Sequence, residues 1–274
     1  MTPSSPPTLI GLPYDASSSY LRGGAAAPPL IREALHASAS NSWSEAGIDL
    51  GAPGVLADAG DLDLPPTAAA RTIITAGIQH VLDDGGRPLA LGGDHSVTYA
   101  ILRAVGLRYP GLTLVHIDAH PDLYADFEGD RFSHACPFAR IVEEGLVRRL
   151  VQIGIRTLNG HQREQAARFG VEIIDMRAWV AGVRPALAGP IYLSIDLDGI
   201  DPGFAPGVSH REAGGLTPRE VITIIQNLPG PVVGADIVEY NPSQDHAGVT
   251  APLCAKLVKE VASRMIEAGS ANAS

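Results

Sequence analysis

The chain has 274 residues, of which 45% are hydrophobic and 18% are charged, and this balance excludes an intrinsically disordered chain. Its two cysteines are too few to staple a fold of this length, which excludes a disulfide scaffold. The net charge of −10 argues against a nucleic-acid partner, because duplex-binding domains carry a basic surplus.

No apolar run reaches the roughly 18 residues that a transmembrane helix needs, so we expect no membrane span and no membrane partner. Met1–Thr8 contains no basic residue and no apolar stretch, and we expect no signal peptide there. Together with the low cysteine content, these features predict a cytoplasmic protein.

Short apolar runs rich in Val, Ile and Leu alternate with longer segments of helical periodicity along the whole chain. Their apolar residues follow one another without alternation, which is typical of strands buried on both faces of a parallel sheet. The eight predicted strands are Leu9–Pro13, Gly54–Ala59, Pro88–Leu91, Leu112–Asp118, Leu150–Ile155, Val171–Ile174, Ile191–Asp196 and Val232–Val238.

Helical segments are predicted between these strands, and two of them begin with proline in the first turn, at Pro28 and Pro218. The alternation predicts one α/β domain over residues 1–274, a three-layer α/β/α arrangement, with residues 1–7 and 268–274 frayed. The predicted helices are Pro28–Ala37, Thr67–Asp83, Ser96–Arg108, Pro137–Gly145, His161–Phe169, Thr217–Asn227 and Ala247–Ala268.

Three polar clusters begin where predicted strands end. They read GGDHS over Gly92–Ser96, DAHPD over Asp118–Asp122, and DLDGIDP over Asp196–Pro202. Ligands of open α/β sheets bind at the carboxyl ends of the strands. We therefore expect a functional site at this edge of the sheet.

The clusters hold two histidines and four aspartates with the spacing of metal ligands, since alternate side chains of an extended segment point the same way. Four converging carboxylates repel one another unless cations neutralise them, and two divalent ions would do so. Oxygen and imidazole ligands without a thiolate favour a hard ion, with manganese first. Such a pair generates hydroxide near neutral pH, which predicts metal-assisted hydrolysis. The candidate ligands are His95, Asp118, His120, Asp122, Asp196 and Asp198.

Each cluster also has a simpler interpretation when it is taken alone. Gly-Gly-Asp after a strand is often only a turn with an Asp helix cap, and a single Asp at a strand end usually caps or faces solvent. The metal interpretation depends on all three clusters occurring together.

The three motifs, with the last read as SIDLDGIDPGFAPG, resemble those of the ureohydrolases, the family of arginase and agmatinase. Segments such as Phe132–Ala135 and Phe204–His210 are most similar to the plant-type arginase branch. The resemblance implies an arginase/deacetylase-like fold with an eight-stranded parallel sheet, and two Mn²⁺ ions per subunit held by the six candidate ligands. Asp118, Asp122 and Asp196 are then the bridging or shared ligands.

The resemblance also assigns catalytic roles. His134, in Ser-His-Ala, corresponds to the proton shuttle, and its ordinary pKa near 6.5 suits that role. Glu239 corresponds to the carboxylate that pairs with the substrate guanidinium, which carboxylates bind as a fork. Asp122 accepts a proton from the hydroxide and passes it to the leaving amine. Substitution of His120 by alanine is then expected to remove metal and activity together.

The implied reaction cleaves the guanidino group of arginine, or of an arginine modified on that group, to ornithine and urea or a substituted urea. Agmatine, giving putrescine and urea, is an alternative substrate, and so is N-hydroxyarginine in an antibiotic pathway. A different class, the deacetylase-like amidohydrolases with one zinc ion, shares the fold, and a non-catalytic relative would hold no metal. A metal count separates these interpretations.

Two segments depart from the animal arginases. Glu128–Ser133 replaces a Ser-Gly-Asn segment that holds the amino-acid end of arginine, and Val208–Glu212 replaces Thr-Gly-Thr-Pro. Arg211 either meets a substrate carboxylate or pairs with Glu212 on the rim. The family implies a trimer or hexamer, with a monomer left open.

Overall fold

A parallel sheet of eight strands organises the computed structural model, which describes residues 6–271. The strands lie in the order β2-β1-β3-β8-β7-β4-β5-β6, and every neighbouring pair is parallel. The predicted fold class is therefore confirmed. The strands are β1 Pro7–Leu12, β2 Ala57–Asp61, β3 Arg87–Gly92, β4 Thr113–Ile117, β5 Arg149–Ile155, β6 Glu172–Asp175, β7 Ile191–Asp196 and β8 Val232–Val238.

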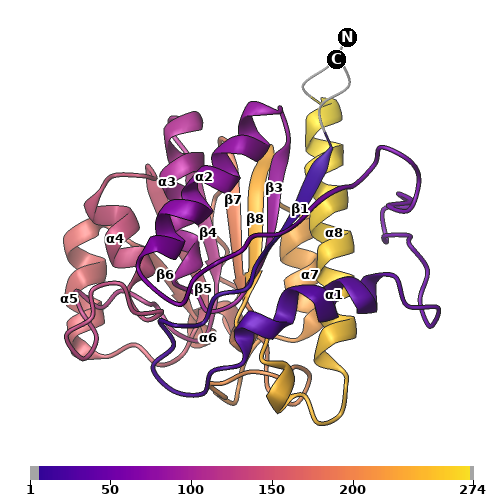
Figure 1. The fold of residues 1–274 in the computed structure, drawn as a ribbon. Coiled ribbons are helices and arrows are strands. Elements are labelled where there is room, and N and C mark those ends of the chain that lie inside the picture. The colour runs from indigo at the N-terminus through magenta and orange to yellow at the C-terminus, as the bar shows by residue number, and fades with distance from the viewer. Residues whose placement is uncertain (1–5, 272–274) are drawn as a thin grey trace.

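Helices cover both faces of the sheet, as Figure 1 shows. Helices α2, α3, α4 and α5 pack in sequence on one face, while α1, α8 and α7 pack together on the other, where α6 lies against β5. The helices are α1 Ala27–Leu35, α2 Ala69–Asp83, α3 Val97–Arg108, α4 Pro137–Glu143, α5 Gly160–Phe169, α6 Met176–Val180, α7 Pro218–Gln226 and α8 Thr250–Ala271.

The sheet separates two hydrophobic cores, because successive side chains of a strand point to opposite faces. In β3, Leu89 and Leu91 join the core under α1, α7 and α8, while Ala90 joins the core under α2 and α3. Strands buried on both sides explain why the apolar runs of the sequence lack alternation. The central strands therefore give rigid support to the residues that follow their carboxyl ends.

Local sequence explains where helices begin. Pro218 occupies the first turn of α7, and Thr217 and Glu220 form a capping box that satisfies the free N–H groups there. Helix α6 was not predicted, since its five residues are too few to show a helical period. Its N-terminus is instead defined by Asp175, whose side chain accepts from the Ala178 N–H.

The helices and strands reach close to both ends of the described part. Pro7 lies in β1 and α8 runs to Ala271, while most of the residues predicted to fray, 1–5 and 272–274, lie outside the described part. Across residues 6–271, no helix is both long enough and apolar enough to cross a membrane.

Four strands at the centre of the sheet, β3, β8, β7 and β4, are neighbours. All four run the same way, so their carboxyl ends meet at one edge. The three polar clusters follow β3, β4 and β7, and Glu239 follows β8 directly. The topology thus brings together residues that lie far apart in the chain. His95 and Glu239, for example, are 144 positions apart and form a hydrogen bond.

We predict that Gly93→Ala destabilises the protein by about 1–3 kcal/mol, because its new Cβ would stand 1.8 Å from the Tyr14 carbonyl oxygen and force the backbone to shift. The matched control is Gly160→Ala on α5, where an added Cβ meets nothing within 4 Å. Urea unfolding of both variants measures the difference. Equal stability of the two variants would contradict the packing argument.

Candidate active site

The predicted ligands gather in one buried cluster at the carboxyl ends of β3, β4 and β7. His95, Asp118, Asp122, Asp196 and Asp198 are all buried, and His120 is partly exposed. A cavity of about 220 Å³ opens above them, and its walls include His120, Asp122, Asp196 and Asp198. The structure therefore brings all six predicted residues to one place.

One half of the cluster surrounds His95. Its Nδ1 lies 3.2 Å from Asp118 Oδ2, 3.2 Å from Asp122 Oδ2 and 3.0 Å from Asp196 Oδ2. Three carboxylate oxygens thus lie within 3.2 Å of one imidazole nitrogen.

The other half surrounds His120. Its Nδ1 lies 3.0 Å from Asp198 Oδ2 and 3.5 Å from Asp118 Oδ1. Asp118 therefore presents one oxygen to each histidine. The cluster divides into two ligand groups that share this carboxylate.

The carboxylates are close enough to disturb one another strongly. Burial, together with the charges of Asp198 and Asp118, raises the pKa of Asp196 well above its usual range. Burial and Asp118 likewise raise the pKa of Asp198 to about 7, although His120 opposes the change. Negative charge at this site is costly unless cations stand among the oxygens.

The surroundings of His95 indicate that the cluster fits divalent cations. Its Nδ1 is buried and has no hydrogen-bond partner among residues 6–271, although three carboxylate oxygens lie close by. Nitrogen and oxygen atoms that crowd together without hydrogen-bond geometry are the arrangement of ligands around an ion. The donor set, with carboxylates and imidazoles and no thiolate, suits Mn²⁺ and similar ions.

A hydrogen-bond relay sets the tautomer of His95. Ser194 donates its hydroxyl hydrogen to Asp236 Oδ1 at 2.6 Å, so its oxygen accepts from His95 Nε2 at 3.0 Å. With the hydrogen on Nε2, the lone pair of His95 Nδ1 points at the carboxylates. Asp236 also accepts from Tyr192 and Thr98, which holds this carboxylate in place. Relays of this kind commonly orient metal-binding histidines.

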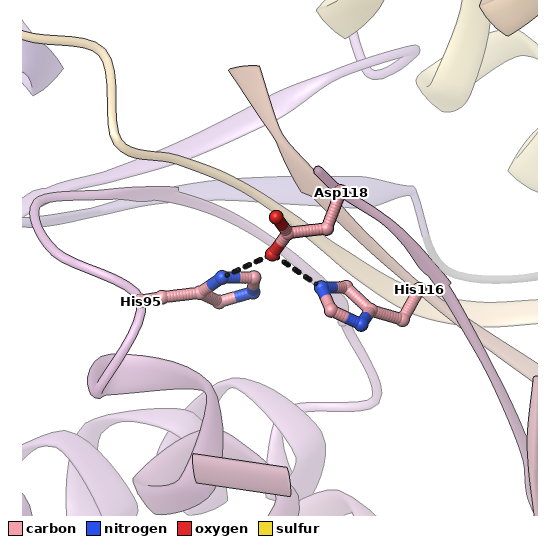
Figure 2. A group of neighbouring side chains, drawn as sticks. All are labelled: His95, His116 and Asp118. Atoms are coloured by element: carbon pink, nitrogen blue, oxygen red, sulfur yellow. Dashed lines mark hydrogen bonds and ion pairs between the residues drawn. The ribbon is translucent and has the colours of Figure 1, made fainter. Parts of the chain in front are cut away.

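His116 joins the cluster, and the sequence analysis missed it. Figure 2 shows Asp118 between the rings of His95 and His116. His116 Nε2 lies 2.7 Å from Asp118 Oδ2, and its Nδ1 lies 3.0 Å from the Gln152 amide nitrogen. Both ring nitrogens are therefore engaged by protein groups, which distinguishes His116 from His95. The signal in the sequence was a histidine and a glutamine inside otherwise apolar strands.

Burial lowers the pKa of His116, even though Asp118 opposes the change. Phe138 stacks on this ring with ring centroids 3.8 Å apart. His116 is thus a packed histidine that contacts a predicted ligand.

Glu239 and His134 form a buried pair on the wall of the cavity. Glu239 Oε1 accepts from the His95 backbone N–H and contacts His134 Nδ1, both at 2.9 Å. Burial opposes the charge of each, yet their attraction raises the pKa of His134 to about 9 and lowers that of Glu239. His134 Nε2 meets the hydroxyl of Ser19 at 2.8 Å.

Asp122 and Glu239 adopt left-handed backbone conformations, which residues with a side chain disfavour. Asp122 has φ 49° and Glu239 has φ 63°. Each such residue costs roughly 1–2 kcal/mol and persists only where its surroundings hold it. The strain supports a functional role for both side chains.

Asp94 shows the simpler interpretation that the sequence left open for GGDHS. Its carboxylate accepts from the Ser17 and Ser96 backbone N–H groups and does not join the ligand cluster. It stabilises the loop that carries His95.

The mouth of the cavity is lined by residues that the sequence analysis left unassigned. They are Ser19, Tyr124, Phe127, Thr157, Gln162 and His210, with Glu212. Arg211 is absent from this wall and donates to the carbonyls of Pro206 and Gln244. Among the described residues Arg211 forms no ion pair with Glu212, so neither of the two alternatives left open for it is found.

A larger cavity, of about 370 Å³, lies against α6 and α7. Its wall is mostly apolar, with Trp179 and Ile224, and its charged Glu220 is already bonded to Trp179 and Thr217. None of the predicted site residues lines it. The chemistry therefore lies in the smaller cavity.

We predict that Glu239→Gln lowers the pKa of His134 from about 9, because burial still lowers this pKa while the carboxylate that raises it most is lost and only Asp122 and Asp94 still raise it. NMR titration of metal-depleted protein measures it. In the wild type, the stability gained from the pair is complete below about pH 6.5 and is lost as pH rises through about 9. Glu212→Gln is the control, and an unchanged His134 pKa in Glu239→Gln contradicts the assignment.

Comparison with known proteins connects this geometry to a family. A model described as arginase family matches residues 6–263. A protein named mitochondrial arginase, from Medicago truncatula, is 45% identical over 94% of this chain and 81% of its own length. The solved arginase of that plant superposes with a TM-score of 0.89 at 43% identity, covering 96% of this chain and 88% of its own.

Two further relatives are more distant. An agmatinase from Bacillus anthracis is 35% identical over 92% of this chain and 89% of its own length. The structure of proclavaminate amidino hydrolase from Streptomyces clavuligerus has a TM-score of 0.82 at 31% identity, covering 97% of this chain and 94% of its own.

The expected cytoplasmic location is wrong by this comparison, since the Medicago relative is named mitochondrial. The low cysteine content shows only that the fold does not need disulfides, and it does not separate the compartments in which thiols stay reduced. The match over residues 6–263 and the identity over nearly the whole chain lead to one conclusion: this chain is a hydrolase of the arginase family.

Proposed function

We propose that the protein is a dinuclear manganese amidinohydrolase that cleaves arginine, or arginine modified on the guanidino group, to ornithine and urea or a substituted urea. The observation that carries this proposal is the division of the ligand cluster into two groups that share Asp118. The similarity to a plant arginase over 94% of the chain supports arginine as the substrate.

The two ion positions follow from the two groups. His95, Asp122 and Asp196 would hold one ion, and His120 and Asp198 the other, with Asp118 between them. Asp122 and Asp196 are further candidates to serve both groups. Two Mn²⁺ ions bound by these residues would supply a hydroxide nucleophile near neutral pH.

The protein's own groups place the substrate and move protons. Glu239 lines the cavity and would pair with the guanidinium through its second oxygen, since Oε1 is held by His134 and by the His95 N–H. Asp122 lies at the cavity floor, where its carboxylate would accept a proton and deliver it to the leaving amine. His134, bonded through Nε2 to Ser19, would exchange protons with solvent.

Agmatine is a second candidate substrate because of the charges at the cavity mouth. The lining contains no lysine or arginine to meet an α-carboxylate, and it contains Glu212, whose side chain is 45% exposed. A carboxylate there would favour a substrate with a cationic far end. Arginine would instead be held by neutral donors such as Ser19, Thr157 and His210.

Other candidates are less well supported. A deacetylase-like enzyme with one zinc ion leaves the His120 group without a purpose. N-hydroxyarginine would give hydroxyurea in place of urea, so its product distinguishes it. We further propose that residues 1–274 form a single ureohydrolase domain, and that it assembles into a trimer or hexamer as the family resemblance implies.

The first test is a product assay on the manganese-loaded enzyme, with arginine, agmatine, guanidinobutyrate and N-hydroxyarginine offered in parallel. We expect the highest kcat/KM with arginine, with urea and ornithine as products detected by mass spectrometry. Preference for agmatine would support the second candidate. No turnover of any of the four by protein with two bound ions would refute an amidinohydrolase.

We predict that His120→Ala loses one ion and reduces urea release by more than about 100-fold, because even partners one layer further out typically change metal affinity or activity by about 10–100-fold. Elemental analysis after dialysis gives the ion count. His80→Ala is the control, because that histidine is 79% exposed on α2. Full turnover by His120→Ala would refute the ligand assignment.

We predict that Glu212→Gln reduces kcat/KM for agmatine about 5-fold more than for arginine. The far end of agmatine is a lone cation, whereas arginine carries a carboxylate beside its ammonium, and an exposed ion pair is worth about 1 kcal/mol. Steady-state assays with both substrates measure the ratio. Equal effects on the two substrates would remove Glu212 from recognition.

A further inference from the structure

Gln152 is a polar side chain in an apolar place. It lies in the middle of β5, is completely buried, and is paired in register with His116 on β4. Its neighbours Leu150, Val151 and Ile153 are core residues. Burying an amide is unfavourable unless it makes hydrogen bonds, so the contacts of this side chain indicate why it is there.

The amide of Gln152 contacts two groups near the ligand cluster. Its Nε2 lies 2.6 Å from the Pro121 carbonyl oxygen and 3.0 Å from His116 Nδ1. A carbonyl oxygen only accepts, so the atom beside Pro121 is the amide nitrogen and not the amide oxygen. Its two N–H groups serve the two contacts.

This geometry determines the tautomer of His116. Because Nδ1 accepts from Gln152, the ring hydrogen lies on Nε2 and is donated to Asp118 Oδ2 at 2.7 Å. The Phe138 ring, stacked at 27° to the imidazole, holds the ring plane. Asp118 is thereby oriented so that its two oxygens serve the two ligand groups.

The second contact reaches the loop that carries Asp122. Pro121 directly precedes Asp122, whose left-handed backbone conformation needs support from its surroundings. The hydrogen bond from Gln152 holds the carbonyl at this point of the chain. One side chain therefore supports the orientation of two proposed metal ligands.

The amide oxygen of Gln152 shows what a glutamine costs at this position. Among residues 6–271 it finds no hydrogen-bond partner, although it is fully buried. An apolar side chain would avoid that cost, so the two N–H donations are what the site gains from a glutamine here.

We propose that Gln152 is a positioning residue for the metal centre, which acts by setting the tautomer of His116 and by holding the Pro121 carbonyl beside Asp122. The inference rests on the proposed metal centre and deepens it. In this arrangement neither Gln152 nor His116 would itself be a ligand, because both ring nitrogens of His116 are engaged by Asp118 and Gln152. Both would determine how tightly Asp118 and Asp122 bind the ions.

The test compares Gln152→Met with Gln165→Met. Methionine has a similar length and removes both donors, and Gln165 is a buried glutamine on α5 whose amide nitrogen has no partner among the described residues. Competition with a chelator measures Mn²⁺ affinity, and elemental analysis measures the ion count at saturation. We expect Gln152→Met to bind two ions with about 10- to 100-fold lower affinity, and Gln165→Met to match the wild type.

A second measurement reads the tautomer of His116 directly in the wild type. With ¹⁵N-labelled histidine and Zn²⁺ in place of manganese, the His116 ring nitrogens report the tautomer, assigned by their absence in His116→Gln. Hydrogen on Nε2 and a free lone pair on Nδ1 support the proposal. Hydrogen on Nδ1, or a metal bond to either nitrogen, overturns it.

The remaining outcomes separate this inference from the proposed function. If the wild type binds two ions and Gln152→Met has the same affinity, the positioning role is refuted while the metal centre stands. If the wild type itself fails to bind two ions, the proposed function fails and the inference fails with it.

Discussion

Four buried carboxylates crowd the carboxyl ends of adjacent strands, and their mutual repulsion is the constraint on which the rest of the site depends. Burial and neighbouring charge raise the pKa of Asp196 and Asp198, which measures how unfavourable this gathering is. A fold tolerates such a cluster only if cations bind in it and if the surrounding structure is rigid. The doubly covered sheet supplies the rigidity, because its central strands are packed on both faces.

A layer of neutral polar groups beneath the carboxylates gives them direction. The hydroxyl of Ser194 sets the tautomer of His95, and the amide of Gln152 sets that of His116. These groups come from β7 and β5, and each is a polar residue between apolar neighbours in a buried strand. The geometry of the ligand residues is therefore decided one layer below them, by hydrogen bonds of uncharged side chains.

The site combines two kinds of structure. Its floor is built on strand ends, and its mouth on loops that include Ser19, Phe127 and His210. Similar proteins are named as arginase, agmatinase and proclavaminate amidino hydrolase. Loops change without disturbing the sheet, so recognition of the far end of a substrate can diverge while the reaction is kept.

The sequence by itself determined the strand pattern, the parallel sheet and the gathering of the ligand residues, because strand burial and motif spacing are local properties. Only the tertiary structure decided the roles of His116, Gln152 and Ser194, since those depend on which strands become neighbours and on their register. The tertiary structure also decided that Arg211 donates to the Pro206 carbonyl. Hydrogen-bond partners across a sheet are long-range facts, and no local pattern in the chain encodes them.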